Sequence, residues 1–451
     1  MQTPDLAFPT LATAATALRR HRISSVELTR SALDRAKALN SRIAAMTEIT
    51  AESALREAAR IDRRRRSGAK LGPLAGIPLA IKDIIDTTPA VCSSGLSFLE
   101  DYRPAADADV VRRLRRAGGV VVGITATDPG AFGVRTPAVT HPQAPGRTVG
   151  GSSGGSAAAL AAGFCLGSLG TDTGGSIRIP SACCATVGLK PTRGRVSLQG
   201  IRPLVWSLDH VGPMARRVAD LALFQAALDP HYARTRGSQK RRPAIGYDPT
   251  YSADADPQVQ AGLETALSAC RDLGAYLRPV ALPTPDEALH IHGIIFCAES
   301  AAYHRTEFPD MLDRYPPLIR QIFGMAERSS GVDYVQAMRR RDAITEQVDA
   351  LFHEVDFVLT PTIPVLPPMV DTQTITLANK SYDYTFAMVR YTCLFDHTGH
   401  PVVAMPATIV ADGLTTSIQV VGRRHRDADV LAFATRLEQA LQLSIDYPMR
   451  A

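Results

Sequence analysis

The amino-acid sequence predicts an α/β fold in which a mixed β-sheet is flanked by helices. Short apolar runs rich in Val, Ile and Leu alternate with segments of helical periodicity, the order expected of strands and helices packed in layers. Of the 451 residues, 45% are hydrophobic and 21% are charged, so the chain has enough apolar side chains for a large core. No internal repeat or low-complexity tract interrupts this pattern.

The N-terminal part is expected to be helical. Ser24–Glu27 has the pattern of a capping box, and the apolar spacing after it predicts a helix over about 25–40. A second helix is expected over 51–66, where a Ser-Gly pair follows. We expect residues 1–70 to wrap around a core formed by residues 71–451, so that the chain is one compact domain overall.

The next segment brings a lysine to the end of a predicted strand. The apolar run 77–81 predicts the strand, and Lys82 follows it directly. If the strand enters the interior, burial disfavours the charged ammonium and lowers the pKa of the lysine, which can then accept a proton. Asp107 is expected to cap the following helix, Val120–Val122 to form a buried strand, and residues 125–148 to form a loop.

The second half of the chain continues the alternation of helices and strands. The expected elements are helices over 215–228, 257–274 and 427–443, mainly helix over 286–355, and strands over 244–247, 276–280, 357–362, 401–409 and 415–421. The polar, basic segment 231–242 is expected to be an exposed connection.

Charge and cysteine content exclude several classes of function. The net charge is +6, and its basic runs at 63–66 and 234–242 contain no interleaved aromatic residues, so we expect solvated surface rather than a nucleic-acid site. Seven cysteines without a CxxC pair indicate reduced thiols, and no His/Cys cluster has zinc-ligand spacing, so we expect no metal and no cofactor. No apolar stretch is long enough to cross a membrane, and the N-terminus lacks a signal-peptide pattern. We therefore expect a cytoplasmic protein.

Two glycine-serine turns are the most informative feature of the chain. They are Gly150–Ser156 and Asp172–Ser176, and the small residues Ala157–Gly163 between them suit a tightly packed helix. Closely spaced glycines let backbone N–H groups approach a bound group, and serines held there can act as nucleophiles or proton carriers.

Five segments together resemble the amidase signature family, and the resemblance extends from about residue 10 to 445. They are GIPLAIKD at 76–83, GGSSGGSAAALAAG at 150–163, GTDTGGSIRIP at 170–180, GLKPTRGRVS at 188–197 and SLDHVGPMARRVAD at 207–220. The resemblance implies a mixed sheet of about eleven strands sandwiched between layers of helices. It also implies amide hydrolysis without a metal or cofactor, with a small-molecule amide as substrate.

The resemblance further implies a Ser–Ser–Lys triad. Ser176 matches the nucleophile, Ser152 the bridging serine beside a cis peptide bond, and Lys82 the general base. The matching oxyanion-hole donors are the backbone N–H groups of Thr173, Gly174, Gly175 and Ser176. These roles agree with physical chemistry, because a serine needs a base to take its proton and a neutral lysine can replace histidine. A second serine both donates and accepts, so it can pass the proton in either direction.

Supporting roles are expected for the neighbouring polar residues. Asp172 and Arg178 are predicted to form a structural ion pair, and Ser153, Thr171 and Thr173 to brace the turns by hydrogen bonds. Candidate walls of a substrate pocket are Phe132, Trp206, Tyr382, Tyr384, Tyr391 and the region 361–400. Candidate groups for binding an acidic substrate are Arg135, Arg390 and His397.

The chain departs from the family pattern outside the triad. Val149 replaces a proline before the first turn, Gly123–Ala126 replaces Gly-Lys-Thr-Asn, His141-Pro142 replaces Asn-Pro, and Ala185 replaces a glycine. The loop over 124–142 borders the acyl pocket in family members, so these changes bear on substrate choice. The compact loop resembles free-standing small-amide hydrolases more than the amidase subunit of a glutamine-dependent tRNA amidotransferase, which stays an alternative. Family members are often homodimers, and the sequence leaves this open.

Two other classes of protein match short motifs only. Gly151–Gly155 fits the G-x-S-x-G pattern of an α/β-hydrolase with Ser153 as nucleophile. Its acid and histidine would have to come from Asp209, Asp396, His397 or His400. A phosphate-binding loop fails, because no Gly-Lys-Ser/Thr ending follows the first turn.

Overall fold

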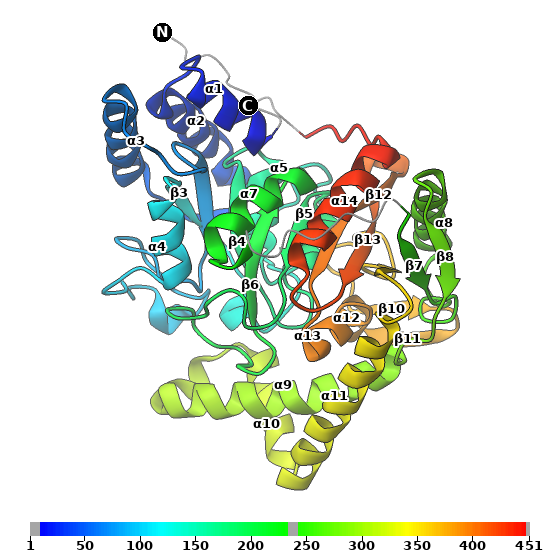
Figure 1. Ribbon diagram of the computed structural model, residues 1–451. Coiled ribbons are helices and arrows are strands. Elements are labelled where there is room, and N and C mark those ends of the chain that lie inside the picture. Colours follow the sequence, from blue (N-terminus) through cyan, green and yellow to red (C-terminus); the bar gives the residue numbers. More distant parts are fainter. Residues whose placement is uncertain (1–9, 233–241, 448–451) are drawn as a thin grey trace.

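An eleven-stranded mixed sheet runs through the molecule in the computed structural model, which describes residues 10–232 and 242–447 (Figure 1). The strands of this sheet are β1 (Met46–Ile49), β2 (Pro78–Lys82), β3 (Val120–Thr125), β4 (Gly167–Asp172), β5 (Val187–Lys190), β6 (His210–Ala215), β7 (Ala244–Tyr247), β8 (Tyr276–Pro279), β9 (Phe357–Pro361), β12 (Val402–Ile409) and β13 (Thr415–Gly422). Their order is β1-β3-β2-β4-β6-β5-β12-β13-β9-β7-β8. The predicted fold class and the sheet implied by the resemblance are confirmed.

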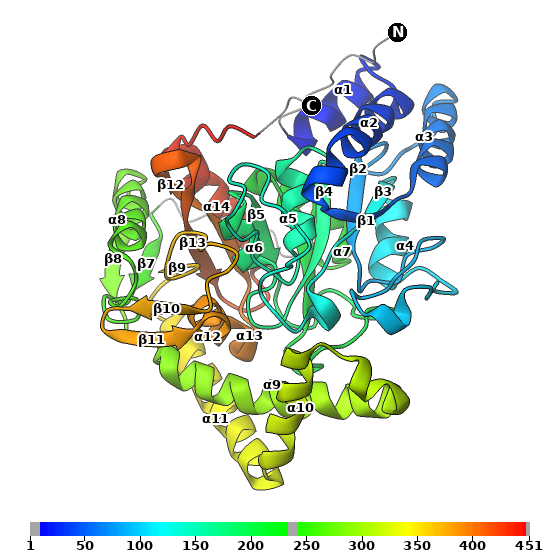
Figure 2. The same ribbon diagram turned by 180° about the vertical axis from the view of Figure 1, so that it is seen from behind.

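Helices cover both faces of the sheet. The α-helices are α1 (Leu11–Arg19), α2 (Ser25–Ile43), α3 (Ala51–Arg66), α4 (Asp109–Arg116), α5 (Gly154–Ala161), α6 (Arg178–Cys183), α7 (Val218–Leu228), α8 (Pro257–Asp272), α9 (Pro285–Glu307), α10 (Pro317–Arg328), α11 (Gly331–Leu351), α12 (Tyr384–Val389), α13 (Leu394–Thr398) and α14 (Asp427–Leu441). Helices α7, α8 and α14 lie on the face seen in Figure 1, and α5 and α6 lie on the face seen in Figure 2. Apolar side chains form two buried clusters. One lies between α7, α8, α14 and strands that include β12 and β13, and the larger one contains consecutive residues of β2 and β3, so it covers both sides of these strands.

The N-terminal helices pack against the first strands and α7. The capping box is present, with the Ser24 hydroxyl accepting from the Glu27 N–H and the Glu27 carboxylate accepting from the Ser24 N–H. The carboxylate of Asp220 on α7 accepts the N–H groups of Leu11 and Ala12 at 3.0 Å each, which ties α1 to the core. One buried apolar cluster includes both Leu11, near the start of the described chain, and Tyr447, at its end. The division at residue 70 stays a prediction.

Most predicted elements are present within a few residues, with two corrections. Asp107 does not cap α4, because its carboxylate accepts the N–H and hydroxyl of Thr88 and pairs with Arg115 instead. The predicted helix over 215–228 begins only at Val218, since Ala215 is the last residue of β6. Most of the predicted exposed connection over 231–242 lies outside the described residues.

Helices α9, α10 and α11 form an arm that lies apart from the sheet, at the bottom of Figures 1 and 2. The hairpin of β10 (Thr374–Leu377) and β11 (Lys380–Asp383) lies nearby and leads into α12. No helix in the described part of the chain is long and apolar enough to cross a membrane. All seven cysteines are buried and unbridged.

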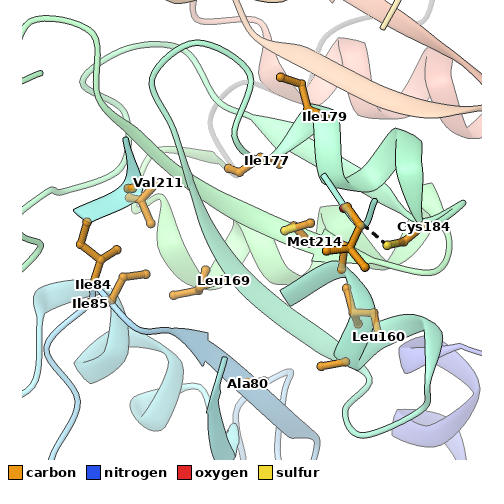
Figure 3. Close-up of a cluster of buried hydrophobic side chains, with 14 of the residues drawn as sticks. Ala80, Ile84, Ile85, Leu160, Leu169, Ile177, Ile179, Cys184, Val211 and Met214 are labelled. Carbon is orange, nitrogen blue, oxygen red and sulfur yellow. Dashed lines mark hydrogen bonds between the residues drawn. The ribbon is translucent and has the colours of Figure 1, made fainter. Parts of the chain in front are cut away.

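Parallel pairing places three strand ends at one edge of the sheet. Strand β2 pairs in parallel with both β3 and β4, so the carboxyl ends of all three meet there. Beneath this edge, apolar side chains from β2, α5, β4, α6 and β6 belong to one buried cluster, including Ala80, Leu160, Leu169, Ile179 and Met214 (Figure 3). The loops that follow these strand ends carry the two glycine-serine turns.

Candidate active site

Lys82 ends β2 with its amine between two hydroxyl groups. Its Nζ lies 2.7 Å from Ser152 Oγ and 2.8 Å from Thr171 Oγ1. Strands β2 and β4 are paired so that Ile81 lies opposite Leu169, which brings the lysine alongside Thr171. An amine held in this way can exchange a proton with one hydroxyl while the other fixes its position.

The surroundings of Lys82 favour its neutral form. The side chain is fully buried, and burial lowers the pKa of Lys82 from its ordinary value to about 7, because the ammonium loses its hydration. The carboxylates of Asp172, Asp128 and Asp209 oppose this effect. Above pH 7 most of the amine is therefore neutral and able to act as a base.

The loop before α5 holds Ser152 rigidly. The Ser152 carbonyl accepts the Asp128 N–H and the Thr127 hydroxyl, both at 3.1 Å, and the Thr136 hydroxyl at 3.2 Å. The peptide bond between Gly151 and Ser152 is cis. A Cβ on Gly155 would come within 2.5 Å of the Ala126 backbone, so only glycine lets α5 begin this close to the loop that follows β3.

The second turn presents four backbone N–H groups. The carbonyls of Gly174, Gly175 and Ser176 accept hydrogen bonds from the Thr392 hydroxyl, the Ile179 N–H and the Ser153 N–H, at 2.5, 2.7 and 3.2 Å. Within the described chain, the N–H groups of residues 173–176 have no recorded acceptor. A turn with fixed carbonyls and free N–H groups can bind a negatively charged oxygen.

Ser176 lies on a turn that is hydrogen-bonded to the residue after Ser152. Its carbonyl bond to the Ser153 N–H joins the two glycine-serine turns. Its side chain borders a cavity, and its hydroxyl makes no recorded hydrogen bond within the described residues. The structure therefore joins Lys82 and Ser152 directly, and places Ser176 on the adjacent turn with a free hydroxyl.

A buried charge cluster anchors this second turn. Arg178 Nε and Nη2 donate to the two oxygens of Asp172 at 3.0 and 2.8 Å, and Nη2 also donates to Asp396 at 2.6 Å. Burial alone would raise the pKa of Asp172, but the guanidinium outweighs it and holds that pKa well below its usual range. Asp172 also accepts the Ile177 N–H at 3.0 Å, so the carboxylate closes the turn that carries Ser176.

Ser153 has the contacts of a supporting residue. Its Oγ donates to the Thr171 carbonyl at 3.2 Å and accepts the Thr171 N–H at 3.3 Å. The partners required by the α/β-hydrolase alternative are engaged elsewhere. Asp209 binds Thr173, Asp396 binds Arg178, His397 contacts His292, and His400 contacts Thr398. The geometry does not support Ser153 as a nucleophile.

A cavity of about 320 Å³ opens from Ser176, Thr173 and Gly174 between α9, α10 and α12. Phe132 lines it, as do four residues of the predicted region 361–400, namely Asp383, Thr385, Phe386 and Val389. The other predicted wall residues, Trp206, Tyr382, Tyr384 and Tyr391, are not among its lining residues. Trp206 is instead 51% exposed.

The three groups suggested for binding an acidic substrate have other partners. Arg135 lies over the Tyr384 ring and donates to two backbone carbonyls. Arg390 pairs with Asp254 and Asp286, and His397 contacts His292. We correct that expectation, because none of the three faces the cavity. In the described part of the chain no group of three or more His, Cys, Asp or Glu residues could hold a metal ion.

Comparison with known proteins identifies the family. The model of the family described as Amidase matches residues 27–431. The chain belongs to the amidase family. One subunit of the glutamyl-tRNA(Gln) amidotransferase of Chloroflexus aggregans is 35% identical, with 99% of this chain and 98% of that protein covered. A putative amidase AmiD from Mycobacterium tuberculosis is 32% identical over 90% of this chain and 88% of its own length. A crystal structure of an amidase superposes with a TM-score of 0.89 at 31% identity, covering 95% of this chain and 99% of that one. This chain is accordingly an amidase, a hydrolase of C–N bonds.

Several contacts in this amidase site are not predicted from the sequence. Thr171 is expected only to brace the turn, yet it holds the lysine amine. Thr392 and Asp396 reach the second turn from a segment more than 200 residues away. His292 on α9 borders the same turn, and a Cβ on Gly174 would lie 2.9 Å from its Nε2. The only sequence signal for the role of Thr171 is the alternation of polar and apolar residues. No local signal in the sequence marks Thr392, Asp396 or His292 as part of the site.

Replacing Arg178 by methionine is expected to destabilise the amidase by about 3–5 kcal/mol, because Asp172 is left buried without its partner. The urea midpoint of unfolding measures the effect. Arg278→Met provides the control, since Arg278 pairs with Glu354 on the surface and such pairs are worth about 1 kcal/mol or less. Equal midpoint shifts in the two variants would contradict an anchoring role for Arg178.

Proposed function

We propose that this amidase hydrolyses carboxylic amides through an acyl-enzyme on Ser176, releasing ammonia or an amine. The observation that carries the proposal is the fully buried Lys82 amine, 2.7 Å from the Ser152 hydroxyl and next to the turn that presents Ser176. A lysine whose pKa is lowered to about 7 by burial is a base at physiological pH. A buried lysine with a purely structural role would not need a second hydroxyl adjacent to a free nucleophile.

Acylation begins when Ser176 Oγ attacks the amide carbon. The Ser176 proton passes to Ser152, whose own proton passes to Lys82. The carbonyl oxygen becomes negatively charged and is held by the N–H groups of residues 173–176, and one such donor is typically worth roughly 3–4 kcal/mol. The C–N bond then breaks as the proton returns from Lys82 through Ser152 to the leaving nitrogen.

Deacylation repeats these steps with water. Water attacks the acyl carbon and gives its proton to the same Ser152–Lys82 pair. The ester bond to Ser176 breaks, and the returning proton regenerates the serine hydroxyl. No metal or cofactor enters either half of the reaction, and we place it in the cytoplasm, where the seven thiols stay reduced.

Partition of the acyl group between water and hydroxylamine tests the acyl-enzyme. An amide and an ester with the same acyl group should give the same ratio of hydroxamate to free acid, because both pass through one intermediate. Mass spectrometry of acid-quenched protein should place the acyl group on the peptide that contains Ser176. Different ratios for the two substrates would mean that water attacks the amide directly.

The second candidate function is that of the amidase component of a tRNA-dependent amidotransferase. It is favoured by the relative from Chloroflexus aggregans, which is named as part of such an enzyme and matches nearly end to end. In that case the isolated chain would depend on partner proteins and use glutamine as its amide. Ammonia release by the isolated chain from simple amides, without ATP or tRNA, decides between the two candidates.

A further inference from the structure

The cavity beside Ser176 is apolar beyond its catalytic end. Thr173 and His292 lie at the turn that carries Ser176, and the other polar lining residues are Gln321 on α10 and Asp383 and Thr385 at the start of α12. The rest of the wall carries mainly large apolar side chains, which are Phe132 in the loop after β3, Phe296 on α9, Leu318, Ile322 and Met325 on α10, and Val389 on α12. An amide bound with its carbonyl at Ser176 therefore extends its acyl group into an apolar space.

No cation faces this space. Among the described residues that line the cavity there is no lysine or arginine, and the one carboxylate is Asp383, which caps the start of α12. His292 is held by its contact with His397 at 3.3 Å, and burial lowers the pKa of His292 to about 4, so it is neutral at physiological pH. A carboxylate on the acyl group would lose its hydration here without gaining a positively charged partner.

The mouth of the cavity has the same apolar character. Leu318 is 49% exposed and Phe386 is 42% exposed, and both line the cavity. A neighbouring hollow of about 330 Å³ shares Gly293, Cys297, Met325 and Phe386 with it, and Arg328 lines that hollow. Arg328 is not among the described residues that line the cavity beside Ser176, so a short carboxylate chain bound there has no counter-charge on the walls of that cavity.

We propose that this amidase acts on uncharged amides with an apolar acyl group and rejects amides that carry a carboxylate a few carbons from the reacting carbonyl. The proposal rests on the proposed function, since it concerns the substrate of that same site. It also disfavours glutamine, whose α-carboxylate and α-ammonium would both enter the apolar space.

Hexanamide, glutaramate and glutamine test the proposal, because their chains are similar in length and differ in charge. Ammonia release should give a kcat/KM for hexanamide that is at least about 100-fold above the value for either charged amide. The reason is that burying a charged group without a partner costs a large amount of free energy. A higher kcat/KM for glutaramate or glutamine, or equal values for all three, would overturn the proposal and leave the amidase function intact. Failure to hydrolyse any amide would instead remove the proposed function on which it rests.

Two substitutions on α10 refine the test. Ile322→Lys places a cation in the cavity wall and should raise the ratio of glutaramate to hexanamide kcat/KM at least about tenfold. Glu327→Lys places a lysine on the same helix outside the cavity, and it should leave the ratio within about twofold of the native value. An unchanged ratio in folded Ile322→Lys would overturn the assignment of this cavity to the acyl group, and the native ratio is informative even if that variant does not fold.

Discussion

Replacing Ser176 by alanine is expected to lower kcat for amide hydrolysis by about 10⁵-fold or more, since losing the nucleophile of such a unit costs nearly as much as losing the whole unit. The fold should persist, because the Ser176 hydroxyl makes no recorded hydrogen bond within the described chain and its carbonyl still accepts the Ser153 N–H. Ammonia release from purified protein measures the loss, and circular dichroism checks the fold.

Ser153→Ala is the matched control for this prediction. Ser153 is a serine on the neighbouring turn and is fully buried, and among the described residues its hydroxyl bonds only to the Thr171 backbone. Its substitution should leave kcat within about tenfold of the native value, which is the range of a lost supporting hydrogen bond. If the Ser153→Ala variant is inactive and the Ser176→Ala variant is active, Ser153 is the nucleophile, as the α/β-hydrolase alternative requires.

Replacing Lys82 by methionine is expected to lower kcat about 10³-fold, which is typical of losing a general base. Methionine has a similar length and is apolar, so it fits the fully buried site without a charge. Lys37→Met on the exposed face of α2 should leave kcat unchanged. A Lys82→Met variant within tenfold of the native rate would exclude this lysine as the base.

The dependence of kcat/KM on pH in the native enzyme should reflect the titration of Lys82. Only neutral Lys82 accepts a proton, and burial lowers its pKa to about 7, so kcat/KM should rise through pH 7 and level off above it. Lys190 is a second buried lysine with a pKa lowered to about 7, but it bonds to His210 and the Pro191 carbonyl. The rise of kcat/KM near pH 7 should therefore persist in the Lys190→Met variant. If the rise is lost in that variant, the titration belongs to Lys190 and not to Lys82.

Local sequence patterns predict an element correctly where contacts within that segment determine its structure. The Ser24–Glu27 capping box, the helix over 51–66 and the strand over 244–247 depend on neighbours only a few residues away, and each is present. The prediction of Asp107 as a cap is wrong, because its tertiary partners Thr88 and Arg115 compete for the same carboxylate. A local signal fails when a distant group offers the polar atom a better partner.

The walls of the pocket are poorly predicted from the sequence. Aromatic residues were chosen by type, and of these only Phe132 lines the cavity. Helices α9 and α10 supply eight of the nineteen described lining residues, and the apolar positions of these helices are equally typical of ordinary helix packing. Which of these positions face the site is determined by where the arm lies relative to the strand ends that carry the two turns (Figure 2).

The sequence by itself determined the fold class, the family resemblance and the residues of the two glycine-serine turns, because glycine turns and strand patterns act over short distances. The tertiary structure decided the rest. It brought Thr171 to the lysine through the register of β2 and β4, and it brought Asp396 to Arg178 across 218 residues. It also left the cavity beside Ser176 without a cation among its described lining residues, by pairing Arg390 with two aspartates and directing Arg135 to backbone carbonyls. Charge pairing between distant segments depends on the folded geometry, and no local pattern in the chain records it.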